Sequence, residues 1–162
     1  MTSSAARYAV ISAAMLAAWL GAAGFLSAVV APAAFAVLPT RALAGAIVGR
    51  ALPVLFVLGI AFGIGVAVMN RVIGAERRAT IASATYASAC AAALLVALRL
   101  DRELKDLGVP VDTLALTDAR RIAFGRMHGM SVMFMGVGMV AAVIALIVVS
   151  QHVASRTSTT IR

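Results

Sequence analysis

Four long stretches without a charged side chain are the feature that most restricts the fold of this sequence. The charged residues gather between positions 41 and 50, 71 and 78, and 99 and 126, and near the two chain ends. A helix needs roughly 20 consecutive apolar residues to cross a bilayer core of about 30 Å. The sequence therefore predicts an all-α integral membrane protein, a single transmembrane domain over residues 1–162 that forms a four-helix bundle. Its spans are expected at about 8–38, 52–70, 79–98 and 127–150.

The composition agrees with a membrane protein and argues against a nucleic-acid-binding one. Hydrophobic side chains make up 63% of the chain and charged ones 12%, whereas soluble domains are roughly half apolar and about a quarter charged. The net charge is +8, but the basic residues lie at the ends of apolar runs and not along one polar face with interleaved aromatics. We expect a lipid bilayer as the partner, with anionic headgroups as counter-charge, and no nucleic acid.

Small residues and one proline mark the first two spans. Pro32 lacks a backbone N–H, and its ring clashes with the carbonyl group of Ala28, so a bend or a break is expected there. Gly21 and Gly24 in the first span and Gly59 and Gly63 in the second form small faces of the kind that let helices approach closely. These faces are predicted to pack helices together, either inside the bundle or against another membrane protein. Pro53 is expected in the first turn of the second span, where a missing N–H costs nothing.

The third and fourth spans are predicted to continue outside the membrane as a helical hairpin over about 99–126. Gly108 and Pro110 are expected to end its first helix, and Asp112 or Thr117 to cap the second, with Asp118 in the first turn. Three pairs of opposite charges stand four residues apart in the first helix: Arg99 with Glu103, Asp101 with Lys105, and Arg102 with Asp106.

An even number of spans places both termini on one side of the membrane. Lys and Arg divide six to the side of the termini and eight to the other. The positive-inside rule compares such counts, and this difference is too small to fix the orientation.

The run RRIAFGRMHGMSVMFM raises the question of a metal or haem site at His128. Two ligands on one helix should stand three or four residues apart, but those positions hold Phe124, Gly125, Ser131 and Val132, which are not soft-metal ligands. We therefore predict no metal site and no cofactor. His128 either bonds to Ser131 or another nearby polar group, or serves as a proton or ligand group in a bundle cavity.

Two stretches, VVAPAAFAVLPTRALAGAIVGRALP and RIAFGRMHGMSVMF, give the chain a resemblance to the transmembrane protein 205-like family. This is a group of small four-span membrane proteins that is known in bacteria as domain of unknown function 4149. The resemblance implies a four-helix bundle in a bacterial inner membrane and, through the family's eukaryotic member, an association with resistance to platinum drugs. The matching positions are Pro32 and Phe35, Gly45 and Gly49, and Phe124, His128, Gly129 and Ser131.

The sequence predicts a protein without catalytic residues. All six acidic residues lie outside the spans, and no Ser/His/Asp arrangement or phosphate-binding loop is present. The leading interpretation is a non-enzymatic accessory or scaffold subunit that packs against another membrane protein or itself. The alternative is a small-solute or metal handling protein, such as an export or resistance factor, with a cavity bounded by the kinked first span and His128.

Overall fold

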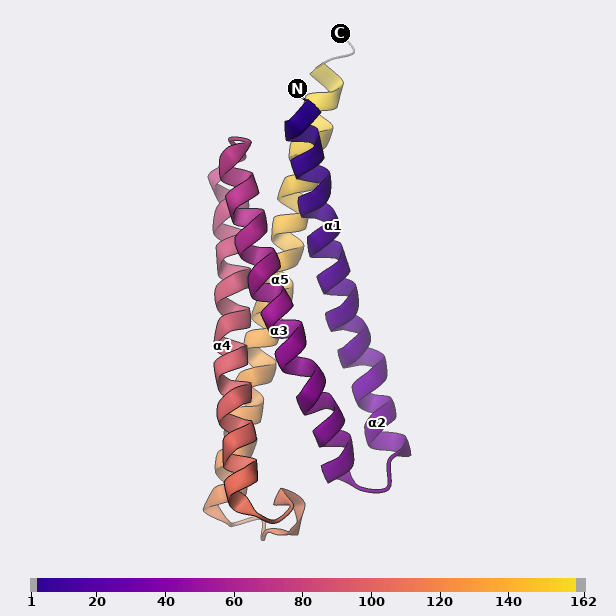
Figure 1. Ribbon diagram of the computed structural model, residues 1–162, viewed down its shortest axis with the longest axis vertical. Helices are drawn as coiled ribbons and strands as arrows, with labels where there is room; N and C mark the ends of the chain where they lie inside the picture. Colours follow the sequence, from indigo (N-terminus) through magenta and orange to yellow (C-terminus); the bar gives the residue numbers. More distant parts are fainter. Residues whose placement is uncertain (1–2, 160–162) are drawn as a thin grey trace.

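The computed structural model describes residues 3–159 of the chain, with side chains over 4–151. Four helical segments in this part of the chain are long and apolar enough to cross a bilayer: Ser4–Val37, Arg41–Val72, Arg77–Leu107 and Ala119–Gln151. They pack as a bundle (Figure 1), so the predicted all-α four-helix architecture is confirmed. The elements in chain order are α1 (Ser3–Phe25), the π-helical turn η1 (Leu26–Val30), α2 (Ala31–Val37), α3 (Arg41–Val72), α4 (Arg77–Leu107), the 3-10 turn η2 (Val111–Thr113) and α5 (Ala119–Thr159).

The four spanning segments differ in how extensively they pack against one another. Helix α4 packs extensively against both α3 and α5, whereas α1 contacts α3 and α5 less. Figure 1 shows α1 and α5 side by side near the chain termini, and α2 leaning away from α4 and α5 at the opposite end. Only 6% of the most apolar window of the α1–α2 segment is buried, against 28–39% for the other three. The bundle is therefore closed at the end that carries the termini and more open at the other.

The disruption expected at Pro32 takes the form of a π-helical turn. The backbone N–H of Ala31 donates to the carbonyl oxygen of Leu26, five residues earlier, and Pro32 follows in the first turn of α2. Widening the turn by one residue removes the need for a hydrogen bond from residue 32 to Ala28. The helix therefore passes the proline and ends at Val37.

The second spanning helix begins earlier than the predicted span. Thr40 has an extended backbone, and its Oγ1 accepts a hydrogen bond from the N–H of Leu43 at 3.2 Å, which is an N-cap. Helix α3 therefore starts at Arg41, and Pro53 lies in its interior. The prediction that Pro53 occupies a first turn was wrong, because the Ala- and Leu-rich residues from position 41 continue the helix.

The predicted hairpin is present, with corrected ends. Helix α4 ends at Leu107, and the C-cap residue Gly108 adopts φ of +67°, a left-handed conformation that favours glycine. Helix α5 begins at Ala119, and its cap is Asp118, whose Oδ1 accepts from the N–H of Arg120 at 2.8 Å. Neither Asp112 nor Thr117 caps α5: Asp112 lies in η2, and Thr117 lies in a turn one residue before the capping Asp118.

Arg121 holds the loop of this hairpin in place. Its Nη1 donates to the carbonyl oxygens of Leu114 at 2.6 Å and Asp112 at 3.4 Å. Of the three predicted ion pairs along α4, only Asp101 with Lys105 lies within 4.0 Å among the described residues, at 2.6 Å. Both of these side chains are exposed, so their pair contributes little to stability.

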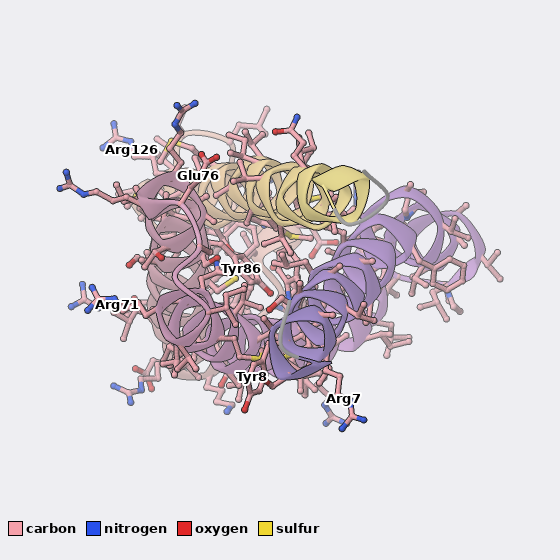
Figure 2. The ribbon with its side chains drawn as sticks, turned by 90° about the horizontal axis from the view of Figure 1, so that it is seen from above. Arg7, Tyr8, Arg71, Glu76, Tyr86 and Arg126 are labelled. Carbon is pink, nitrogen blue, oxygen red and sulfur yellow. The ribbon has the colours of Figure 1, made fainter. Side chains whose placement is uncertain are left out.

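The core forms where all four spanning segments meet. Its largest fully buried side chains are Trp19 on α1, Tyr86 on α4 and Phe56 on α3. The rings of Trp19 and Tyr86 meet edge to face with centroids 4.7 Å apart, and Figure 2 shows Tyr86 pointing into the space between the helices. On α5 the corresponding positions are small: Ala141, Ala142 and Ala145. Small residues on one helix thus make room for aromatic residues on the others.

Candidate functional site

The predicted functional residues of α5 lie on one face of the helix at the open end of the bundle. Phe124 and His128 are one turn apart, and their rings are nearly parallel, with an interplanar angle of 4° and centroids 6.1 Å apart. Ser131 is buried, with 5% of its surface exposed, while His128 is exposed. The same face continues into the buried Gly138 and Ala142. His128 therefore occupies a core-facing stripe at a level where the other helices no longer cover it.

The hydrogen bond predicted for His128 is not present among the described residues. Among the described residues, its side chain makes no hydrogen bond to Ser131 or to a helix end, and its ring contact is with Phe124. Pro32 lies on α2, which packs against α3 and leans away from α5 (Figure 1). The structure thus brings together Phe124, His128 and Ser131 but leaves Pro32 apart from them.

The two predicted glycine pairs have different environments. A Cβ at Gly59 would lie 2.5 Å from Cys90 Sγ and 2.8 Å from Trp19 Nε1, and one at Gly63 would lie 2.8 Å from the Cβ of Ala87. These glycines let α1 and α4 approach α3 closely. No described atom lies within 4 Å of a Cβ built at Gly21 or Gly24. That pair does not mediate packing between the helices of this chain.

A buried polar cluster at the closed end was missed by the sequence analysis. Asn70 Nδ2 donates to Ser83 Oγ at 3.4 Å, and Ser83 Oγ donates to the carbonyl oxygen of Ala79 at 2.8 Å. Asn70 is fully buried, and its Oδ1 has no partner within the described residues. The available signal was spacing: Phe56, Gly63 and Asn70 are seven residues apart and share one helix face. Gly63 lies on the packing face, so Asn70 must point inward too.

The hairpin between α4 and α5 contains a groove of about 390 Å³ that the sequence did not predict. Its charged residues are Glu103 and Asp106 on α4 and Arg120 on α5, and all three are exposed. Partly buried apolar side chains form its floor: Leu100, Leu107, Val111, Phe124 and Met127. Phe124 thus contributes both to this groove and to the ring pair with His128.

Arg120 forms a bidentate contact with Asp118, the residue that caps α5 beside the groove. Its Nε and Nη2 donate to the two carboxylate oxygens of Asp118 at 3.1 and 2.8 Å. The hydrogen bonds from the Arg120 side chain and backbone lower the pKa of the Asp118 carboxyl to about 2. Asp118 is therefore charged at neutral pH, and its two hydrogen bonds fix the orientation of the Arg120 guanidinium beside the groove.

Four apolar helices of spanning length, with charged residues confined to the ends and loops, define an integral multi-pass membrane protein. Residues 14–102, more than half of the chain, match the family described as Domain of unknown function (DUF4149). The chain belongs to this family. The predicted membership of the domain of unknown function 4149 family is thus confirmed, whereas the match does not show the relationship to transmembrane protein 205.

The matched region runs from α1 into α4, so the Phe124–His128 pair on α5 lies beyond it. No curated protein and no solved structure matches the chain.

Proposed function

We propose that this protein is a non-enzymatic accessory or scaffold subunit that packs against another membrane protein or a second copy of itself. The observation that carries the proposal is a face of small residues on α1 that no other helix of this chain covers. Gly21 and Gly24 lie on the least buried spanning segment, with open space where a side chain would be. Lipid alone can cover an apolar helix, but small residues specifically permit close approach of another helix.

The buried glycines of α3 support this use of the exposed pair. At Gly59 and Gly63 neighbouring helices come so close that an added Cβ would meet them within 3 Å. Gly45 and Gly49 on the same helix have the same four-residue spacing and face open space. The chain therefore has one glycine face, at Gly59 and Gly63, that packs against its own helices, and two others that do not.

The experiment is gentle detergent extraction followed by native mass spectrometry of what purifies with the chain. We expect a stoichiometric partner polypeptide or a homo-oligomer. The double variant Gly21→Leu/Gly24→Leu should dissociate it, because two bulky side chains block close approach. Gly136→Leu is the matched control, since Gly136 is an exposed glycine on α5 that also has no described atom within 4 Å of an added Cβ. The control should keep the assembly.

A chain that purifies alone and monomeric would contradict the proposal. If, in addition, cells that lack this protein showed altered efflux of a solute or metal, the alternative function in solute or metal handling would be supported instead. Loss of assembly in Gly136→Leu to the same degree as in the double variant would show that the α1 face is not the contact.

A further inference from the structure

The groove between α4 and α5 extends from the boundary of the hydrocarbon core to the outer edge of the lipid headgroup layer. The uncharged run of α4 ends at Leu98 and that of α5 begins at Met127. At 1.5 Å per residue, the backbone of Glu103 lies about 7.5 Å and that of Asp106 about 12 Å beyond the first boundary, and that of Arg120 lies about 10.5 Å beyond the second. The headgroup region is roughly 5–7 Å thick on each side of the hydrocarbon core. The apolar floor at Phe124 and Met127 therefore adjoins the acyl chains, and the charged residues lie at and just beyond the outer edge of the headgroup layer.

The two walls of the groove carry opposite charges. Glu103 and Asp106 on α4 have no ion-pair partner within 4.0 Å among the described residues. Arg120 on the α5 wall uses Nε and Nη2 for Asp118, which leaves its Nη1 donors available. A ligand with an ammonium group and a phosphate group a few bonds apart would complement this arrangement.

We propose that this groove binds a zwitterionic phospholipid with a primary amine, phosphatidylethanolamine. The ammonium group donates to Glu103 and Asp106, the phosphate accepts from Arg120, and the first part of an acyl chain lies over Leu100, Phe124 and Met127. Phosphatidylcholine has no N–H to donate to the carboxylates, and phosphatidylglycerol has no cation at all. The charge pattern therefore selects the amine-bearing headgroup, and this selection does not depend on a protein partner.

The test uses the full chain in detergent, with each of the three lipids added in turn and bound lipid counted by native mass spectrometry. Phosphatidylethanolamine is expected to bind best. The variant Glu103→Gln/Asp106→Asn should bind it about tenfold more weakly. It removes two exposed ion pairs with the ammonium group, and each such pair contributes a factor of up to about five. Asp112→Asn is the matched control: it removes one negative charge from the same hairpin but lies outside the groove lining. It should leave the preference unchanged.

A second variant tests the volume of the groove. Ala123 is exposed and lines the groove, so Ala123→Trp fills it without removing a buried contact. Binding of phosphatidylethanolamine should be lost in this variant while the carboxylates remain.

Circular dichroism and a single elution peak establish whether each variant is folded. If a variant does not fold, photoreactive phosphatidylethanolamine on the unmodified chain should crosslink to residues 99–107 and 119–127. Equal binding of the three lipids, an equal loss in Asp112→Asn, or crosslinks confined to other segments would overturn the proposal. Capture of a peptide or protein segment in the groove in place of the lipid would also do so.

Discussion

Gly59 is the residue on which two core side chains converge. Trp19 is held there by a hydrogen bond from its Nε1 to the carbonyl oxygen of Leu55 at 2.8 Å, so it cannot move aside without losing that bond. In Gly59→Ala the added methyl group would lie 2.5 Å from Cys90 Sγ and 2.8 Å from Trp19 Nε1. Overpacking of this kind costs about 1–3 kcal/mol. We expect a clear loss of melting temperature in detergent.

The control for this substitution is on the same helix. Gly49→Ala adds the same methyl group where no described atom lies within 4 Å, so its melting temperature should be near that of the unchanged protein. Equal effects of the two substitutions would mean that Gly59 does not form the contact described.

The first turn of α5 is an element whose stability should depend on pH. The folded-state pKa of Asp118, about 2, is below the usual 3.8. The capping carboxylate therefore contributes stability that is fully present above about pH 4 and is lost as the pH falls through 2. Asp118→Asn keeps a capping oxygen but removes the charge attraction to Arg120. We expect the melting temperature of this variant to fall less between pH 5 and pH 2.5 than that of the unchanged protein.

Asp112→Asn provides the comparison for that titration. Asp112 lies in the same hairpin but does not cap α5, so this variant should keep the full loss of stability on acidification. If NMR showed the carboxyl carbon of Asp118 titrating near pH 4, the capping contact could not be the cause of the pH-dependent stability.

At the scale of the whole molecule, the up-and-down path of four spans predicts which loops share a side of the membrane. Single cysteines at Ala6 and Glu76, in a Cys90→Ala background, should react with a membrane-impermeant maleimide from one side of sealed vesicles. Cysteines at Pro39 and Thr117 should react only from the other side. Reaction of the Ala6 and Glu76 positions from opposite sides would mean that the segment between them does not cross twice.

Much of the fold could be predicted because the relevant signals are local. A charge at Arg50 or Arg71 is costly inside a bilayer whatever its neighbours are, so the uncharged runs between charges mark the spans. Gly108 ends α4 as predicted, since its own backbone conformation does so. The start of α3 was predicted too late because Pro53 was read as a boundary, although a spanning helix tolerates proline.

The candidate site could be predicted only in part. Phe124, His128 and Ser131 share a face by helical periodicity alone, and the structure keeps them together. The groove near Phe124 was missed because its walls belong to two helices that are joined by the loop from Gly108 to Asp118. Opposite charges across that groove are separated in the sequence, and no spacing rule connects them.

The sequence by itself determined that four segments are long and apolar enough to cross a bilayer and roughly where the chain turns between them, because the transfer of each side chain from water to lipid depends mainly on that side chain. Only the tertiary structure decided that Gly59 and Gly63 are buried between helices while Gly21 and Gly24 are not. It also decided that His128 is uncovered. Each of these outcomes depends on the distance between helices, which is set by the side chains of both neighbours together.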